Sequence, residues 1–298
     1  MTYSIVGRDP ATGELGVAIQ SHYFSVASGA VWGEPGVGVV VTQMMLEPSY
    51  GPRGLALMRA GASASDALAK LVAQDGAAAT RQVAMLDATG RAAAYTGAAC
   101  VAAAGQSEGE GVSAQGAILS SERTPAEMVR AFEEARGDLA ERLVDALGAG
   151  ERAGGDLRGM RSAALIVVAA KETGRPWIDR VVELSVPDHP NPISELRRLV
   201  TMQRLFARAG RALDAALAGD MAAGLAEYAS LAREAPDDPD LAFRHGLLLT
   251  LAGKPREARR RFDVCYRLHD GWAEAVRRLP MAGYIADDPA VMGEILPS

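Results

Sequence analysis

The sequence predicts an α+β protein: a four-layer αββα sandwich over residues 1–190, followed by a small all-α domain over residues 191–298. β-type runs group at the two ends of the first segment with helical zones between them. A doubly wound sheet would require a steadier alternation of strands and helices. The runs 37–41 and 163–168 are apolar at consecutive positions, which is typical of strands covered on both faces. After residue 190 the sequence contains no strand-like run.

The elements of the first segment follow from local patterns. Two β runs joined by the turn 9–13 predict a hairpin. A helical zone is expected over 54–71, where Ser63 is a candidate N-cap for the second half. Another is expected over 124–147, which opens with Thr-Pro and breaks near residue 137. The expected strands are 3–8, 14–21, 37–43, 82–87, 92–96, 163–170 and 180–186.

The second segment follows a stiff linker of turn-forming residues, 187–192, and every later stretch is typical of helices. Gly219-Asp220 and Gly253-Lys254 lie 34 residues apart, and Tyr228 and Phe262 share that offset. A period of this length is the helix–turn–helix spacing of tetratricopeptide repeats. Only about two units fit, below the ~3 usually needed for an independent solenoid, so the segment is expected to pack on the first domain or on a partner protein. A plain helical bundle with a coincidental spacing is the alternative.

Composition excludes several classes of protein. The longest uniform apolar stretch, 163–170, is far shorter than the ~20 residues that span a bilayer, and no signal peptide is visible. Cys100 and Cys265 form no CxxC pair, which excludes a disulfide scaffold and a Cys-rich zinc site. A net charge of −6 is unsuited to binding nucleic-acid phosphates. We expect a cytoplasmic protein that binds neither nucleic acid nor a membrane.

Thr2 is the residue that points most directly to a chemistry. It opens the first expected strand, and removal of Met1, which is expected before a small residue, would make Thr2 the N-terminal residue. A free N-terminal Thr carries a hydroxyl nucleophile and an α-amine base, and that amine titrates near ~8. The hypothesis is therefore an N-terminal-nucleophile (Ntn) hydrolase. Ser4, two positions along the same strand face, is the alternative nucleophile.

A set of ordered motifs supports this hypothesis. They are 2–6 (TYSIV), 16–22 (GVAIQSH), 36–43 (GVGVVVTQ), 48–54 (PSYGPRG) and 154–159 (GGDLRG) leading into 162–165 (SAAL). On these motifs, roughly residues 1–200 resemble a bacterial and archaeal family of uncharacterised proteins assigned to the Ntn hydrolase superfamily. The resemblance implies an Ntn-hydrolase-like fold but no particular reaction. Such folds often assemble, so a homo-oligomer is expected.

Some relatives in that family carry a C-terminal module described as peptidoglycan-binding. The tail 272–296, with its Arg278-Leu279-Pro280 and Asp287-Asp288-Pro289 segments, resembles it. Contact with mature cell wall would require an export signal, which the sequence does not show.

The reaction implied by the Ntn hypothesis begins with attack of Thr2 on the acyl carbon of a C–N bond. The freed amine would carry the proton, and backbone N–H groups or Gln43 would hold the oxyanion. Proteasome-like relatives place an acidic residue and a lysine near the threonine. Here the second strand ends in Gln20-Ser21-His22 and the next ends in Thr42-Gln43, without a lysine.

Several further side chains are candidates for the site. His22 is either a general base or substrate ligand, or a structural hydrogen-bonding group. Asp156 could orient the nucleophile and Arg158 could bind a substrate carboxylate through two parallel hydrogen bonds, or the pair could simply close a turn. Arg53 or Arg158 could also stabilise an oxyanion. The expected set is Thr2, His22, Gln43 and Asp156 as catalytic residues, with Ser21, Arg53 and Arg158 as substrate-binding residues.

Cofactor and metal sites are not expected. His189, His245 and His269 lack metal-ligand spacing. The glycines of 36–38 and 105–116 lack the P-loop and dinucleotide fingerprints, so tight turns are expected there.

The leading functional hypothesis is an Ntn-type amidohydrolase that acts on a small amide or a related C–N bond. One alternative is a non-catalytic scaffold whose helical tail binds a partner protein, and another is cell-wall binding through that tail. Arg256 and 259–261 form a basic helix face that could attract an acidic partner, although Glu257 and Asp263 also fit a solvated, partly paired surface.

Overall fold

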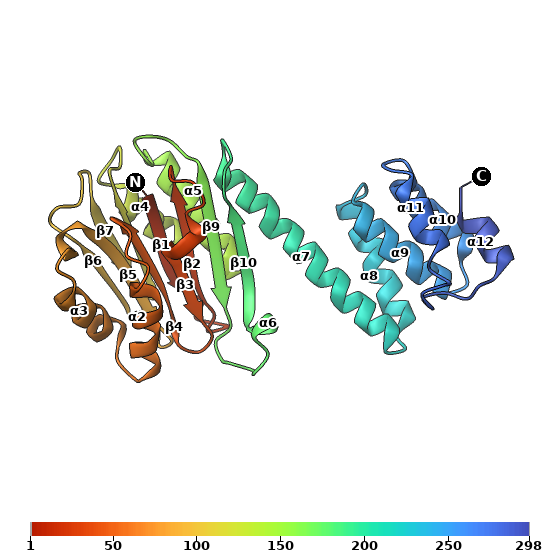
Figure 1. Cartoon of the computed structure of the whole chain (residues 1–298), viewed down its shortest axis with the longest axis horizontal. Coiled ribbons are helices and arrows are strands. Elements are labelled where there is room, and N and C mark those ends of the chain that lie inside the picture. The colour runs from red at the N-terminus through yellow and green to blue at the C-terminus, as the bar shows by residue number, and fades with distance from the viewer. Residues whose placement is uncertain (1, 298) are drawn as a thin grey trace. The chain divides into compact units, whose positions relative to one another are not determined.

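The computed structural model describes residues 2–297 and divides the chain into two compact units, Met1–Val200 and Thr201–Ser298. The first unit contains two β-sheets with helices, and all of its named strand pairs are antiparallel (Figure 1). This arrangement confirms an α+β fold.

The larger sheet of the described chain has six strands in the order β10-β9-β2-β1-β8-β7. They are β1 (Thr2–Arg8), β2 (Leu15–Ser21), β7 (Gly105–Gly109), β8 (Val112–Ala117), β9 (Ser162–Val168) and β10 (Arg180–Val186). β1 and β2 form the predicted hairpin, whose turn is held by Asp9 as it accepts backbone hydrogen bonds from Ala11 and Thr12. Its register places Thr2 opposite Ser21.

The smaller sheet has the order β3-β4-β5-β6. Its strands are β3 (Val31–Glu34), β4 (Gly38–Met44), β5 (Arg81–Asp87) and β6 (Ala92–Thr96). The helical elements of this unit are α1 (Ala27–Ala30), α2 (Tyr50–Arg59), α3 (Ala64–Gln74), the 3₁₀ turn η1 (Ala78–Thr80), α4 (Thr124–Glu134), α5 (Leu139–Arg152) and α6 (Pro176–Asp179). The predicted cap is confirmed, because Ser63 accepts a hydrogen bond from the Asp66 backbone at the start of α3. The predicted break near residue 137 separates α4 from α5.

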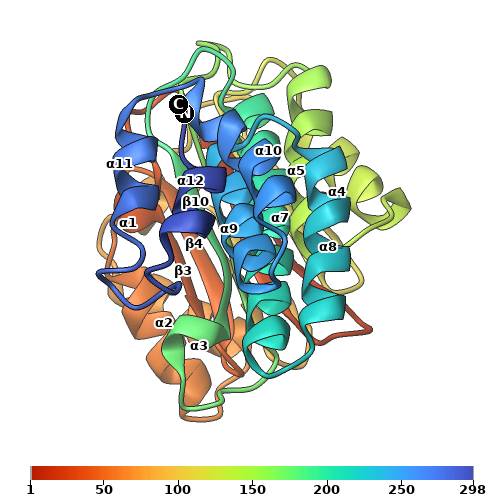
Figure 2. The ribbon, with the colours of Figure 1, turned by 90° about the vertical axis from the view of Figure 1, so that its right-hand side faces the viewer.

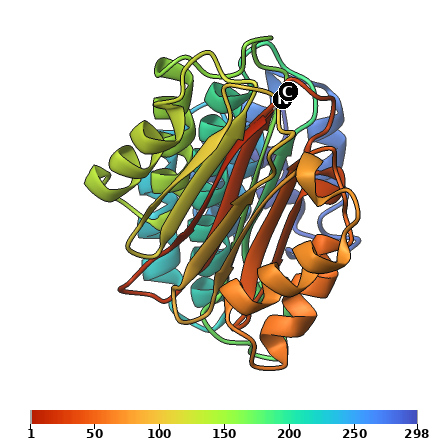
Figure 3. The same ribbon diagram turned by 90° about the vertical axis from the view of Figure 1, so that its left-hand side faces the viewer.

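Three apolar cores lie between successive layers of this unit. Ile5 and Phe132 belong to the core between the larger sheet and the pair α4 and α5. Val41 and Ile166 belong to the core between the two sheets. Met85 belongs to the core under α2 and α3. In Figure 3 the sheets lie between the orange helices α2 and α3 and the yellow-green helices α4 and α5.

A pair of facing glycines brings α4 and α5 close to the larger sheet. Gly7 and Gly16 are partners in the β1–β2 register. A Cβ atom on Gly7 would lie 2.7 Å from Phe132 Cζ, and one on Gly16 would lie 2.5 Å from Leu143 Cδ1. Only glycine leaves room for these two side chains. The helices therefore press directly on the hairpin that begins with Thr2.

The segment 105–116 corrects a sequence-based expectation. We expected tight turns there, but the segment contains β7 and most of β8, joined at a turn where Gly111 has a φ of +67°. β8 pairs with β1 inside the larger sheet and is buried along its whole length. Its glycine, alanine and serine residues are weak strand formers, so burial and pairing rather than propensity determine its conformation. β3 was also not expected.

The second unit is helical throughout the part of it that the structure describes. Its helices, shown in cyan and blue in Figure 2, are α8 (Met221–Glu234), α9 (Pro239–Leu251), α10 (Pro255–Tyr266), α11 (Gly271–Arg277) and α12 (Pro289–Ile295). They follow α7 (Pro192–Leu217), which begins in the first unit. Tyr228 and Phe262, the residues related by the 34-residue offset, are both buried, in two different apolar clusters. The repeat assignment itself stays a prediction.

α7 contributes buried side chains to both units. Ile193, Leu196 and Val200 pack in the core that also contains residues of α4 and α5. Leu205 and Ala209, five and nine residues after Val200, belong to the core of the second unit. The single helix is therefore part of two separate cores.

His245 makes the stability of the second unit sensitive to pH. Its ring is buried and stacks on Tyr228, with 5.7 Å between ring centroids. Burial, with a further contribution from the charge of Arg261, lowers the pKa of His245 from 6.5 to about 4. The pKa of His245 is lower in the folded chain than in the unfolded chain, so protonation of the ring favours unfolding. The contribution of the neutral ring to the unfolding free energy is therefore complete above pH 6.5 and is lost as the pH falls toward 4. A shift of this size corresponds to at most about 3 kcal/mol, because solvent near the ring screens part of the effect.

We therefore expect His245→Leu to reduce the dependence of unfolding free energy on pH. Urea unfolding of the wild type and the variant at pH 7 and pH 4.5 measures the difference, and other titrating groups cancel in the comparison. Equal losses of stability in both proteins would contradict the prediction.

Candidate active site

The space between the two sheets changes from apolar to polar toward the beginning of β1. Side chains alternate between the faces of a strand, so Thr2, Ser4 and Val6 all point between the sheets. Val6 belongs to the apolar core there, whereas Thr2 and Ser4 do not. The other strands contribute uncharged polar side chains to the same region, and all of them are buried. The whole group, called here the polar cluster, is Thr2, Ser4, Ser21, Gln43, Gln82, Ser113, Gln115 and Ser162.

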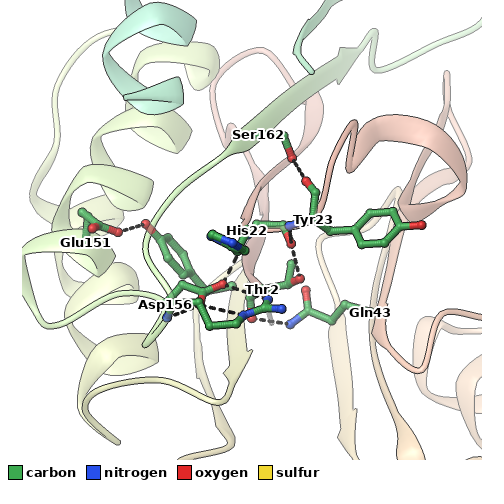
Figure 4. Close-up of polar contacts among 10 residues, drawn as sticks. Thr2, His22, Tyr23, Gln43, Glu151, Asp156 and Ser162 are labelled. Carbon is green, nitrogen blue, oxygen red and sulfur yellow. Dashed lines mark hydrogen bonds and ion pairs between the residues drawn. The ribbon is translucent and has the colours of Figure 1, made fainter. Parts of the chain in front are cut away.

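Thr2 is held by two hydrogen bonds at the start of β1, and only 7% of it is exposed. Its Oγ1 lies 2.9 Å from Ser21 Oγ, and either hydroxyl can donate. Ser21 Oγ also accepts a hydrogen bond from the Tyr23 backbone N–H at 3.0 Å. The Thr2 carbonyl accepts a hydrogen bond from Gln43 Nε2 at 3.2 Å (Figure 4). These contacts fix both the hydroxyl and the backbone of Thr2.

Gln43 uses its amide hydrogens inside the protein. Besides the Thr2 carbonyl, Nε2 donates to Gln82 Oε1 at 2.7 Å. Gln82 is fixed in turn, because its Nε2 donates to the Gly116 carbonyl at 2.9 Å and to Thr96 Oγ1 at 2.9 Å. An amide nitrogen has two hydrogens, and both of those on Gln43 have acceptors. Gln43 therefore positions Thr2 and has no donor left for an oxyanion.

Ser4 is also fully engaged. Its Oγ donates to Gln43 Oε1 at 2.7 Å and accepts from Gln115 Nε2 at 2.6 Å. A serine hydroxyl has one hydrogen, and here that hydrogen is used within the buried network. The geometry of Ser4 is that of a structural group.

A second group of polar residues lies beside Thr2 at the end of β2. Asp156 is buried, and its carboxylate accepts hydrogen bonds from the His22 backbone at 3.3 Å and from the Arg158 backbone at 2.9 Å. The Arg158 guanidinium also contacts this carboxylate, at 3.4 Å. The His22 ring makes no hydrogen bond to Thr2, and its Nδ1 is buried without a partner among the residues described. In Figure 4, His22 and Asp156 lie on one side of Thr2, with Gln43 and Tyr23 on the other.

A pocket of about 260 Å³ opens next to Thr2. Thr2, Ser21 and Gln43 are among its polar lining residues. Apolar lining side chains come from the loop after β2 and from the end of β4, namely Val26, Met44, Met45 and Leu46. No charged side chain is among the described residues that line it.

The loop that forms one wall of this pocket is tied to β9. Ser162 Oγ donates to the Tyr23 carbonyl at 2.6 Å and accepts from the Val26 backbone at 3.2 Å. The Tyr23 side chain itself is 68% exposed at the pocket. On the opposite face of β1, Tyr3 donates its hydroxyl to Glu151 Oε2 at 2.7 Å, which attaches the strand to α5. Burial, with Glu151, raises the pKa of Tyr3 well above its usual value.

The expected site residues thus form two groups, and one residue lies apart from both. Thr2, Ser21 and Gln43 meet at the pocket, and His22, Asp156 and Arg158 form the adjacent group. Arg53 joins neither of them. It lies on α2, where its guanidinium donates to Gln74 Oε1 at 2.5 Å.

Residues 2–196 match a protein family described as a family of unknown function, DUF1028. The chain belongs to the DUF1028 family. A crystal structure of a DUF1028 protein from Silicibacter pomeroyi is similar, with 31% sequence identity and a TM-score of 0.62. The similarity covers 67% of this chain and 85% of that chain. No curated protein matches the sequence.

Membership of DUF1028 confirms the predicted relationship to an uncharacterised family. The polar cluster and the residues lining the pocket lie within the DUF1028 region, whereas α8 to α12 lie outside it. Among residues 2–297, no three His, Cys, Asp or Glu side chains are grouped so that they could hold a metal ion. No helix in this part of the chain is long and apolar enough to cross a membrane.

Sequence reasoning did not identify Gln82, Gln115 and Ser162 in this DUF1028 site. A signal was present, because Gln82 and Gln115 occupy the inward-facing alternation of their strands, where Ala84 and Ala117 are buried. A polar side chain at such a position marks a buried network or a site.

Proposed function

We propose that this DUF1028 protein is an Ntn-type hydrolase that cleaves a small amide or a related C–N bond with Thr2 as its nucleophile. The observation that carries the proposal is the position of Thr2, which lines the pocket. Its hydroxyl oxygen lies 2.9 Å from Ser21 Oγ, and its backbone carbonyl accepts a hydrogen bond from Gln43. Two stacked antiparallel sheets between helix pairs support an Ntn-hydrolase-like αββα sandwich.

The proposed reaction requires a chain whose first residue is Thr2. Its hydroxyl oxygen attacks the acyl carbon, the α-amine takes the hydroxyl proton, and the same proton passes to the departing nitrogen as the C–N bond breaks. Water then attacks the acyl ester on Thr2, releases the carboxylic acid and restores the hydroxyl. Ser21 sets the orientation of the Thr2 side chain. Because Gln43 has no free N–H, backbone N–H groups stabilise the oxyanion.

The charge of the site favours a neutral amine. Burial of an amine lowers its pKa, and a nearby carboxylate would oppose that effect. No carboxylate is among the described residues lining the pocket, and the Asp156 carboxylate is engaged by Arg158. The proposed mechanism uses this amine in its neutral form, in which it can accept the hydroxyl proton. The uncharged pocket also favours a neutral acyl group over a charged one.

One observation favours a second candidate function. No lysine is present among the residues that the structure places around the pocket, whereas proteasome-like relatives use one beside the threonine. The alternative is therefore a non-catalytic scaffold whose helical second unit binds a partner protein.

The proposal is tested first by the intact mass and N-terminal sequence of the protein purified from its native host. We expect Thr2 as the first residue, and release of amine from a panel of small neutral amides. A chain that keeps any residue before Thr2 has its α-nitrogen in a peptide bond, without a basic lone pair. That result would remove the proposed mechanism and favour the scaffold.

A further inference from the structure

The pocket beside Thr2 has two apolar walls that continue outward onto the protein surface. Its apolar lining residues come from the segment after β2 and from the end of β4, namely Tyr23, Val26, Ala30, Met44, Met45 and Leu46. Val26 and Ala30 are buried, whereas Tyr23, Met45 and Leu46 are exposed. Large apolar side chains gathered at the mouth of a pocket are typical of a ligand-binding groove. A ligand that enters here meets apolar side chains both at the mouth and inside.

The exposed side chain of Met45 is carried on a fixed backbone. The Met45 N–H donates to the Thr80 carbonyl at 3.3 Å, and Arg81 Nη1 donates to the Met45 carbonyl at 2.5 Å. Arg81 is held in turn by Asp75, with 2.8 Å between Nε and Oδ2. This wall of the pocket is therefore built in place, while the unbranched thioether side chain of Met45 can adapt its shape to a ligand.

Both walls also contain a residue other than glycine in the left-handed backbone region. The φ angle is +52° at Ser25, in the loop after β2, and +71° at Met44, at the end of β4. Such conformations are unfavourable for residues with a side chain and persist where the surrounding structure imposes them, often beside a ligand site. The loop of Ser25 is tied down, because the Ser25 N–H donates to the Pro187 carbonyl at 2.9 Å. The two walls are thus held in a specific shape.

The two sides of Thr2 differ in polarity, which indicates how an amide would lie across it. Gln43 and Tyr23 lie on the side of the pocket, whereas His22 and Asp156 lie on the other side (Figure 4). The amine released by cleavage is a cation near neutral pH, and a charge is costly in an apolar pocket. The acyl group stays attached to Thr2 until water attacks. The apolar pocket therefore suits the acyl half of the substrate, and the polar side suits the amine half.

We propose that this pocket binds the acyl half of an N-acyl amide whose acyl group is uncharged, apolar and larger than acetyl, with Met45 in contact with its outer part. An acetyl group would leave most of the apolar lining uncovered. A charged chain end would meet no side chain of opposite charge among the described residues that line the pocket. The assignment of the acyl half rests on the function proposed for Thr2, whereas the preference for an apolar chain does not.

The test is titration of the full-length Thr2→Ala variant, which lacks the proposed nucleophile, followed by ligand-observed NMR. The probes are hexanamide, acetamide and adipamate, which is hexanamide with a carboxylate in place of its terminal methyl group. Each methylene removed from water strengthens binding by up to about fourfold. A carboxylate in an apolar pocket is disfavoured. We therefore expect hexanamide to bind at least about tenfold more tightly than either of the other two probes.

Met45→Lys tests whether the bound chain reaches the mouth of the pocket. Met45 is 61% exposed, so circular dichroism and thermal unfolding should show an intact fold. The new ammonium group should weaken hexanamide binding and strengthen adipamate binding, each by roughly threefold or more. Met281→Lys is the matched control, because Met281 is an 87% exposed methionine of the second unit, and both affinities should stay unchanged. Should Met45→Lys not fold, Leu46→Lys carries the same expectation.

The proposal is overturned if acetamide or adipamate binds as tightly as hexanamide, or if the lysine at the mouth leaves both affinities unchanged. These titrations involve no turnover, so their result does not depend on whether Thr2 is a nucleophile. Hexanamide that binds as expected but releases no ammonia with the wild type would count against the function proposed for Thr2 and support the preference of the pocket. A higher kcat/KM for acetamide than for hexanamide would support that function and overturn the assignment of the acyl group.

Discussion

Replacing Thr2 with alanine is expected to reduce kcat/KM for amide hydrolysis on the order of 10³-fold or more, because the variant lacks the hydroxyl proposed as the nucleophile. Thr2→Ser keeps the hydroxyl and the contact with Ser21, so we expect its activity to stay within about tenfold of the wild type. Thr2→Ser should change stability little, whereas Thr2→Ala also loses the buried hydrogen bond to Ser21 Oγ and should show a modest loss of unfolding free energy. The contact between Gln43 and the Thr2 backbone carbonyl is kept in both variants. Steady-state amine release measures the effect, with the N-terminus of each variant verified by mass.

Ser4→Ala is the matched control, because Ser4 is a buried hydroxyl on the same face of β1. Ser4→Ala removes two hydrogen bonds of the polar cluster but leaves the Thr2 hydroxyl in place. We expect a modest loss of stability and retained turnover. The opposite pattern, an inactive Ser4→Ala protein and an active Thr2→Ala protein, would assign the nucleophile to Ser4.

Replacing Gln43 with leucine is expected to lower both stability and turnover. The change leaves the Thr2 carbonyl, Ser4 and Gln82 without their shared partner, and all three residues are buried. Unpaired buried polar groups cost roughly 1–3 kcal/mol each, so we expect a loss of about 3 kcal/mol or more in unfolding free energy. Because the Thr2 backbone loses its anchor, kcat should fall by about 100-fold with little change in KM.

The control for Gln43 is Gln106→Leu, which removes a glutamine whose hydrogen bonds lie at an exposed position on β7. Surface changes of this kind usually stay within about 0.5 kcal/mol. Urea unfolding and amide kinetics are measured on both variants. If Gln43→Leu lowers stability while kcat is unchanged, Gln43 supports the fold and does not position the nucleophile.

The strands that are buried on both faces were predictable when their residues are apolar at consecutive positions, because both faces of such a strand must be apolar. The apolar runs 37–41 and 163–168 fall almost entirely within β4 and β9, which lie in the interior of their sheets. β8 is equally buried but consists largely of small residues, whose strand conformation depends on pairing with β1. Such pairing joins residues more than a hundred positions apart and leaves no local signal.

The candidate site was predictable only where local structure determined it. The hairpin register alone places Thr2 beside Ser21. Gln82 and Gln115 reach the same region through the pairing of β4 with β5 and of β1 with β8, which the sequence does not reveal. Arg53 was assigned from a motif, but its helix packs on the outer face of the smaller sheet.

The helix α7 sets a limit on where this protein can be divided. A boundary at residue 190, or at the end of the DUF1028 match at residue 196, would leave Val200 out of the core of the first unit. The same helix continues into the core of the second unit through Leu205 and Ala209. The first unit therefore extends four residues beyond the end of the family region, and a truncation that keeps its core intact ends after Val200.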